Sequence, residues 1–167
     1  MKRFLGSSKI NTAVFISGTG SNFKNLVKFS CDNKAPIKIN LVISNNSNAK
    51  GLNFAKKFKI EQRIYKYKNR SEDEKKILKL LKRKKIKLIC LAGFMKIISK
   101  NFIKRFNGKI LNIHPSLLPK YKGLNTHFRV IENKEKFSGC TIHFVTSRLD
   151  SGKIILQKKI RVNKNDT

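Results

Sequence analysis

The stretch KILNIHPSLLPKYKGLNTH, residues 109–127, decides the fold and carries the candidate site. It opens on a short apolar run, 110–113, which is too brief for a helix and typical of a buried strand. The strand ends at Pro115, because proline has no N–H to give to a sheet. Side chains two residues apart share one face of a strand, so Asn112 and His114 point together near its carboxyl end. Open α/β sheets bind their ligands at that edge.

An amide donor beside an imidazole suits chemistry at a carbonyl carbon. The Asn112 amide can stabilise a developing oxyanion, and the His114 ring can move protons. The plainer interpretation is that Asn112 caps a turn and His114 is its hydrogen-bonded neighbour. The polar loop that follows, with Pro119 and Gly123, favours the catalytic interpretation, because loops on rigid scaffolds often carry function.

Length and composition indicate one domain with an ordinary core, since the chain has 167 residues and is 40% hydrophobic. Its three cysteines lie far apart without metal-ligand spacing, so we interpret them as reduced thiols of a cytoplasmic protein and expect no metal. No apolar run approaches the ~20 residues of a membrane span. We expect residues 1–10 to be a flexible N-terminal tail ahead of a single domain, 11–167.

The net charge of +30 raises the alternative of a basic nucleic-acid-binding module. The pattern does not favour it, because most of the basic residues are lysines scattered over every segment, without interleaved aromatic residues for base stacking. We therefore expect no specific nucleic-acid partner. The charge would instead attract anionic small molecules.

A glycine-rich turn near the N-terminus is a candidate anion site. A buried strand at 12–17 leads into Gly18-Thr-Gly-Ser-Asn22 and a helix at 23–29, and the free N–H groups of a helix start attract phosphate. Phe23 stands where a dinucleotide fingerprint needs a third glycine, and the next strand, 39–44, ends without a carboxylate for a ribose. A single phosphate is favoured over NAD, and we expect Gly20 to approach it too closely for a side chain. A plain strand-to-helix turn is the simpler alternative.

Strands and helices alternate along the rest of the chain, which predicts a Rossmann-like, doubly wound α/β fold. Residues 71–74 (SEDE) match a capping box, which predicts the start of a helix to about 85, and Ser99 can cap a helix to 106. The apolar run 87–92 is typical of a central parallel strand covered on both faces. Further helices are expected at 49–58 and 126–133, a weak strand at 63–67, and an antiparallel edge of two strands at 140–146 and 154–162.

Four motifs stand in this order: ISGTGSN at 16–22, LAGFMKIIS at 91–99, LNIHPSLLPKYKGLNTH at 111–127 and HFVTSRLDSGKIILQ at 143–157. With them the chain resembles the phosphoribosylglycinamide formyltransferase family over nearly its whole length. The resemblance implies the formyltransferase fold and an enzyme of purine biosynthesis, a one-carbon transferase. It would move a formyl group from 10-formyltetrahydrofolate, its cosubstrate, to the amine of glycinamide ribonucleotide, without a metal.

The resemblance also assigns roles to single residues. The family's catalytic asparagine, histidine and aspartate fall on Asn112, His114 and Asp150, where the aspartate would stabilise the charged imidazole. The substrate phosphate would lie on Gly20, Ser21 and Asn22. The folate would contact Arg70, Met95, Lys96, Ile97, Ile98 and Asn112.

The chain departs from the family at three places. Lys96 stands where an arginine is usual, and Lys122 where a proline is usual. The family also continues beyond the position of Thr167, so we expect the C-terminal part of its domain to be missing. An inactive truncated fragment is therefore one alternative.

Two related enzymes and two further nucleophiles are less favoured by the sequence. Methionyl-tRNA formyltransferase and formyltetrahydrofolate deformylase share part of the 111–127 motif, but each usually carries an additional domain. Ser116 has no nucleophile-elbow motif around it, and Cys140 lies in an apolar strand. His143 lies in the middle of a strand, where we expect a structural, hydrogen-bonded residue, and His127 lies near the loop.

Overall fold

The computed structural model describes residues 8–163 and 166. Within these residues, seven strands form one sheet in the order β3-β2-β1-β4-β5-β6-β7. Strands β1 to β5 run parallel, and β6 and β7 add an antiparallel edge. This confirms the doubly wound α/β fold. The strands are β1 (Ile10–Ile16), β2 (Ile37–Ser44), β3 (Glu61–Ile64), β4 (Leu88–Leu91), β5 (Lys109–His114), β6 (Phe137–Phe144) and β7 (Ile154–Arg161).

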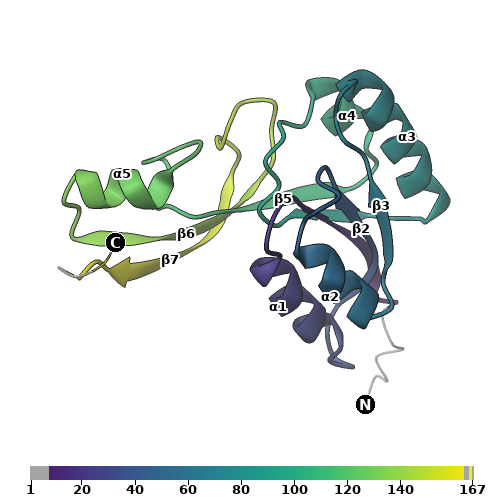
Figure 1. The fold of residues 1–167 in the computed structure, drawn as a ribbon, viewed down its shortest axis with the longest axis horizontal. Coiled ribbons are helices and arrows are strands. Elements are labelled where there is room, and N and C mark those ends of the chain that lie inside the picture. Colours follow the sequence, from purple (N-terminus) through teal and green to yellow (C-terminus); the bar gives the residue numbers. More distant parts are fainter. Residues whose placement is uncertain (1–7, 164–165, 167) are drawn as a thin grey trace, which may run out of the picture.

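Helices cover both faces of the parallel part of the sheet (Figure 1). Successive residues of β1 point to opposite faces, so Ala13 and Phe15 pack into one buried cluster while Val14 and Ile16 pack into another. The first cluster includes residues of α3 and α4, and the second includes residues of α1 and α2. The helices are α1 (Ser21–Ser30), α2 (Gly51–Lys57), α3 (Arg70–Arg83), α4 (Lys100–Arg105) and α5 (Thr126–Glu132).

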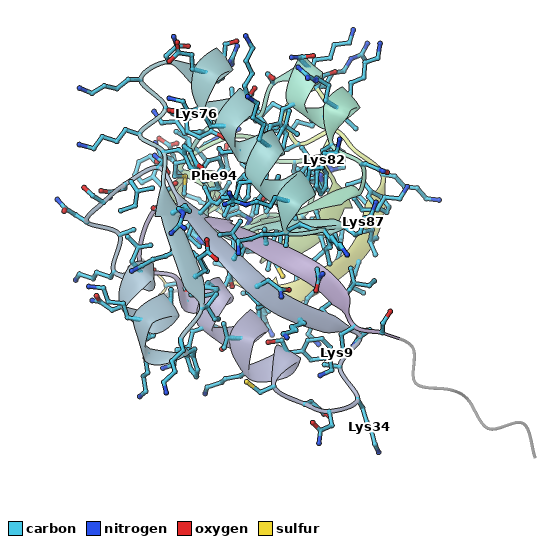
Figure 2. The ribbon with its side chains drawn as sticks, turned by 90° about the vertical axis from the view of Figure 1, so that its right-hand side faces the viewer. Lys9, Lys34, Lys76, Lys82, Lys87 and Phe94 are labelled. Carbon is cyan, nitrogen blue, oxygen red and sulfur yellow. The ribbon has the colours of Figure 1, made fainter. Side chains whose placement is uncertain are left out.

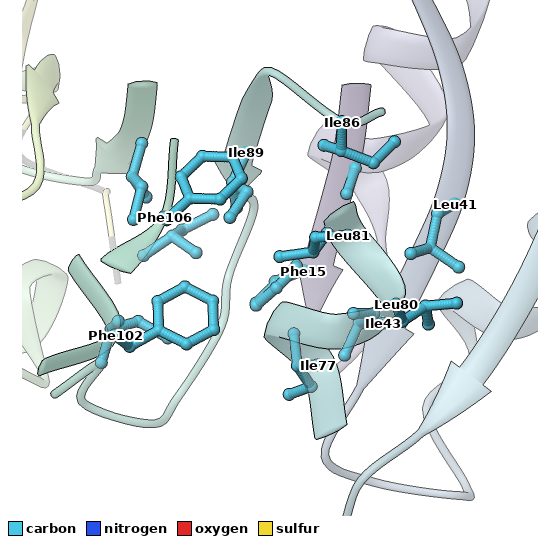
Figure 3. Packing of buried hydrophobic residues seen from close by; sticks show 14 of the residues in the cluster. Phe15, Leu41, Ile43, Ile77, Leu80, Leu81, Ile86, Ile89, Phe102 and Phe106 are labelled. Carbon is cyan, nitrogen blue, oxygen red and sulfur yellow. The ribbon is translucent and has the colours of Figure 1, made fainter. Parts of the chain in front are cut away.

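The cluster beneath α3 and α4 is the larger one, and Figure 3 shows it from close by. Ile77 and Leu81 of α3 are four residues apart, so both lie on the face that meets the sheet, and both are fully buried. Phe15 of β1 meets the ring of Phe102 of α4 edge to face, with 6.5 Å between the ring centroids. These contacts hold the two helices against the sheet.

The start of α3 differs from the expected capping box. Asn69 is the N-cap, and its side chain accepts a hydrogen bond from the Glu72 N–H at 3.3 Å. Glu74 is buried rather than folded back on its own helix, and it accepts from the N–H of Ser99 at 2.9 Å and from its hydroxyl. The capping box at Ser71 was therefore wrong, because a partner from the α4 side was available to the carboxylate. Ser99 does cap α4, as predicted, accepting from the Phe102 N–H at 3.0 Å.

Two more expectations change at their ends. The expected tail at 1–10 is wrong at residue 10, because Ile10 opens β1 and donates its N–H to the Pro36 carbonyl at 2.8 Å. Residues 1–7 lie outside the described part of the chain. The weak strand expected at 63–67 lies earlier, at 61–64, and Tyr67 adopts a left-handed φ of 56° that a strand does not allow.

The last two strands project from the body of the sheet together with α5 (Figure 1). Within the described residues β7 pairs with β6 alone, and all eight of its residues are exposed. Its apolar side chains Ile155, Leu156 and Ile160 are each about half exposed or more.

Basic side chains extend from every visible side of the molecule (Figure 2). Lys76 and Lys82 on α3, and Lys87 just before β4, are exposed examples. The positive charge is thus spread over the surface, as its scatter along the sequence predicted. None of the helices in the described part of the chain is long and apolar enough to cross a membrane.

Candidate active site

Three of the motifs meet at one edge of the sheet. Because β1, β4 and β5 run parallel, their carboxyl ends open on the same edge. The chain leaves β1 toward β2 and β3 and then returns to β4 on the other side, so the strand order reverses between β1 and β4. Ligands of open α/β sheets bind at such a switch point. The glycine-rich turn after β1, residues 92–98 after β4 and the loop after β5 therefore surround one candidate site.

Asn112 and His114 converge with Asp150, as expected. Asp150 lies in the connection between β6 and β7. Because β6 runs antiparallel to β5, this connection can fold back beside β5. One carboxylate oxygen, Oδ2, is 3.4 Å from His114 Nδ1. The other, Oδ1, accepts from Asn112 Nδ2 at 3.4 Å. The N–H of Gly123 also donates to Oδ2, at 2.9 Å, so the loop after β5 helps to fix the carboxylate.

His143 joins this cluster, although the sequence suggested only a structural role for it. It pairs with Asn112 across β5 and β6 and is almost fully buried. Its Nε2 is 3.2 Å from Asn112 Nδ2 and 3.6 Å from Asp150 Oδ1. The sequence did contain a sign of this contact. His143 lies in a strand that was expected at the antiparallel edge, and such a strand can lie beside the one that carries Asn112. The register that brings the two together could not be known beforehand.

The second ring nitrogen of His114 faces the loop that follows β5. Nε2 is 2.8 Å from the carbonyl oxygen of Tyr121, and because a carbonyl only accepts, Nε2 carries a proton. A fully protonated ring can donate to Tyr121 through Nε2 and to Asp150 through Nδ1. His114 is buried in this arrangement, so a ligand can reach Nε2 only when the Tyr121 carbonyl moves away.

The charges in the cluster support one another. Burial alone would raise the pKa of Asp150, but the His143 ring, the Gly123 N–H and the charges of both histidines hold it below its ordinary value. The pKa of His143 is raised, chiefly by its interaction with Asp150, against the opposing effect of burial. The carboxylate is thus kept ionised between two imidazoles, where it stabilises positive charge.

The glycine-rich turn ends at an open helix start. Gly20 is the N-cap of α1, and no side chain of the described residues caps the first turn of this helix or places a negative charge there. Ser21 and Asn22 are exposed. The unpaired N–H groups and the positive end of the helix dipole can therefore accept an anion.

The packing of the chain gives a second reason for a glycine at position 20, which the sequence did not suggest. Its φ is +77°, and a Cβ built there would lie 2.5 Å from the Cα of Gly51, at the start of α2. Gly51 in turn donates its N–H to the Gly18 carbonyl at 3.0 Å. The absence of a side chain at Gly20 thus lets the turn pack against α2, and a substitution there does not report on a phosphate alone.

The residues expected to contact folate lie in two places near this edge. Met95, Lys96 and Ile97 are exposed beyond β4, whereas Ile98 is buried. The Met95 N–H donates to Ser17 Oγ at 2.7 Å, which ties this segment to the end of β1. Arg70, the first residue of α3, is exposed and lines a cavity of about 180 Å³ together with Ser99, the residue after Ile98.

Comparisons with known proteins agree with this architecture. A family model described as "Formyl transferase" matches residues 10–167. The phosphoribosylglycinamide formyltransferase of Haemophilus influenzae is 45% identical over 158 residues, which span 93% of this chain and 74% of that protein. The crystal structure of phosphoribosylglycinamide formyltransferase from Anaplasma phagocytophilum superimposes with a TM-score of 0.89 and 38% identity, covering 96% of this chain and 76% of that one.

The chain belongs to the phosphoribosylglycinamide formyltransferase family. A longer relative is the trifunctional purine biosynthetic protein adenosine-3 of Homo sapiens, which is 43% identical over 162 residues. That match spans 95% of this chain but only 16% of the human protein. The members of this family are transferases. Among residues 8–163 and 166, no group of three or more His, Cys, Asp and Glu is arranged to hold a metal ion.

Proposed function

We propose that this chain transfers the formyl group of 10-formyltetrahydrofolate to the amine of glycinamide ribonucleotide in purine biosynthesis. The observation that carries the proposal is the convergence of Asn112, His114 and Asp150 at the edge where the open start of α1 also lies. The similar Haemophilus influenzae protein, named phosphoribosylglycinamide formyltransferase, supports the same substrate.

The ribonucleotide would bind through its phosphate at Gly20, Ser21 and Asn22. Backbone N–H groups at a helix start suit a phosphate because they point at it as fixed hydrogen-bond donors. The first turn of α1 carries no carboxylate that would repel a phosphate. The surrounding positive surface would raise the local concentration of an anionic substrate.

The folate would lie over the segment after β4. Exposed apolar side chains at Met95 and Ile97 fit a flat ring. Arg70 and Lys96 are cationic and exposed, which fits the carboxylates of the folate tail. When bound, the folate supplies the formyl carbon.

In the transfer, Asn112 Nδ2 would donate to the carbonyl oxygen as negative charge develops on it. His114 would move a proton at Nε2 once the Tyr121 carbonyl has withdrawn. Asp150 would hold the ring of His114 through Nδ1 and stabilise its charged form. No covalent bond to the protein is needed in this scheme.

The reaction would take place in the cytoplasm on small-molecule substrates. In support, Cys31, Cys90 and Cys140 are all unpaired thiols, which is the state that a reducing compartment maintains.

The phosphate assignment can be tested by one charge. Ser21→Asp places a carboxylate in the first turn of α1, where it suits the helix dipole but repels a phosphate. We expect calorimetry to show weaker binding of glycinamide ribonucleotide, with unchanged binding of a folate analogue. Ser21→Asn, which is similar in size and uncharged, is the matched control and should bind nearly as the wild type does. Equal loss in both variants, or loss in neither, would contradict the assignment.

The catalytic assignment can be tested by a double-mutant cycle. His114→Ala should lower the transfer rate by about 10²–10⁴-fold, the usual worth of a positioned proton-transfer group. Asp150→Asn should also be severe alone but should add little after His114→Ala, because residues that act as a unit are not additive. Losses that multiply independently would refute the coupling, and near-normal transfer by His114→Ala would refute the site.

A further inference from the structure

His143 is a buried titratable residue that the proposed chemistry does not use. It lies on β6 directly opposite Asn112 of β5. Its two ring nitrogens have different neighbours: Nδ1 is 2.9 Å from the carbonyl oxygen of Phe144, and Nε2 is 3.2 Å from Asn112 Nδ2. These contacts determine which forms of the ring the site can hold.

The proton of the neutral ring can be assigned from its partners. The Phe144 carbonyl can only accept, so Nδ1 carries the proton and donates to it. Nε2 of the neutral ring then bears a lone pair, which accepts one N–H of the Asn112 amide. The other N–H of the same amide points to Asp150 Oδ1 at 3.4 Å. Both protons of Asn112 Nδ2 are thereby engaged inside the protein.

Protonation of His143 would remove one of these acceptors and compete for the other. A charged ring carries a proton on Nε2 and no longer accepts from Asn112. Its nearest carboxylate oxygen is Asp150 Oδ1, 3.6 Å away, which is the oxygen that Asn112 Nδ2 also contacts. A bond from the charged ring to this ionised oxygen joins two opposite charges, so it is stronger than the bond from the uncharged Asn112 amide that it replaces.

We propose that His143 is a positioning residue for Asn112: the neutral ring holds the Asn112 donor inside the protein, and the protonated ring releases it to the ligand oxygen. The catalytic consequence rests on the proposed function, whereas the coupling between the two side chains does not. The ionisable groups that face His143 are Asp150, from the connection before β7, and His114 of β5 on the far side of that carboxylate. Asp150 also raises the pKa of His143, which favours the releasing form.

The coupling can be measured by NMR on the ¹⁵N-labelled chain without any turnover. We expect the side-chain amide resonances of Asn112 to shift along the same titration curve as the ring of His143, with neutral His143 in the Nδ1–H form. Asn112→Ala should raise the pKa of His143, because it removes a donor that stabilises the neutral ring. Asp150→Asn should lower it. An Nε2–H tautomer, an Asn112 amide that does not follow His143, or a His143 pKa unmoved by Asn112→Ala would overturn the proposal.

Kinetics test the catalytic consequence. His143→Asn keeps a donor near the position of Nδ1 and removes Nε2, so the Asn112 donor is no longer held at any pH. In the wild type we expect kcat to fall as the pH rises through the pKa of His143, which gives the pH profile a descending limb. In His143→Asn this limb should be absent, with KM nearly unchanged. His127→Asn, an exposed histidine on α5, is the matched control and should keep the limb. A limb that persists in His143→Asn would overturn the positioning role.

The two experiments separate the two proposals. If the NMR coupling is present and neither variant nor wild type transfers formyl groups, the proposed function fails and the positioning of Asn112 by His143 stands. If transfer occurs and depends on His114 while the coupling is absent, only the role of His143 fails.

Discussion

Gly20→Ala should destabilise the fold by an amount that can be worked out from two separate costs. The φ of +77° is a left-handed conformation that costs an L-residue roughly 1–2 kcal/mol. The added Cβ would lie 2.5 Å from the Cα of Gly51, which is backbone and cannot rotate away, and such overpacking costs roughly 1–3 kcal/mol. Together they predict a loss of about 2–5 kcal/mol, a large part of the ~5–15 kcal/mol by which domains are stable.

Two more glycines separate the costs. Gly93 has a φ of +73° but no described atom within 4 Å of a Cβ, so Gly93→Ala should carry only the conformational cost of about 1–2 kcal/mol. Gly18 has neither feature, so Gly18→Ala should change stability by no more than about 0.5 kcal/mol. Urea denaturation of the three variants, followed by far-UV circular dichroism, measures all three values. The reasoning is refuted if Gly20→Ala loses no more stability than Gly93→Ala.

Glu74→Gln should cost about 1–3 kcal/mol in urea denaturation, because it replaces one of two buried oxygens that accept from Ser99 by an amide nitrogen that cannot accept, whereas Glu72→Gln at an exposed position should change little. The pKa of Asp150 is lowered in the folded chain, so its contribution to stability is present above its unfolded pKa and is lost as the pH falls through the folded one. When urea denaturation is repeated from neutral to acid pH, the free energy of unfolding should therefore fall less in Asp150→Asn than in the wild type. An equal fall in both would show that this carboxylate does not cause it. In thiol labelling of the native chain Cys31 should react first because it is exposed, and Cys90 should resist, since burial raises its pKa to about 11. Mass spectrometry gives the order of labelling, and the opposite order would contradict this prediction.

The sequence predicted the parts of the site that depend on short-range patterns. The period-2 spacing of Asn112 and His114, the proline that ends their strand and the position of that strand at the carboxyl edge need no knowledge of the rest of the chain. The fold class followed in the same way, because buried strands and amphipathic helices alternate visibly. Asp150 was placed by resemblance to a family, since nothing near it in the sequence says that it returns to β5.

The remainder depends on distant contacts. The place of His143 follows from the register between β5 and β6, which no local pattern encodes. Glu74 was expected in a capping box because its spacing from Ser71 fits one, yet it bonds to Ser99, which is 25 residues away. A glycine at position 20 was predicted from an expected phosphate contact, whereas its close approach to Gly51 depends on how α2 packs.

The exposed edge strand β7 affects the fraction of molecules in which the site is assembled. Asp150 lies in the short connection before this strand, and His143 belongs to the strand that β7 pairs with, while β1 at the centre of the sheet is buried on both faces. An edge with few buried contacts opens locally at a smaller free energy than the whole domain requires to unfold. The fraction of molecules with an assembled cluster is therefore set by this sub-global opening and not by global stability, and backbone amides of β7 would exchange with solvent far faster than those of β1.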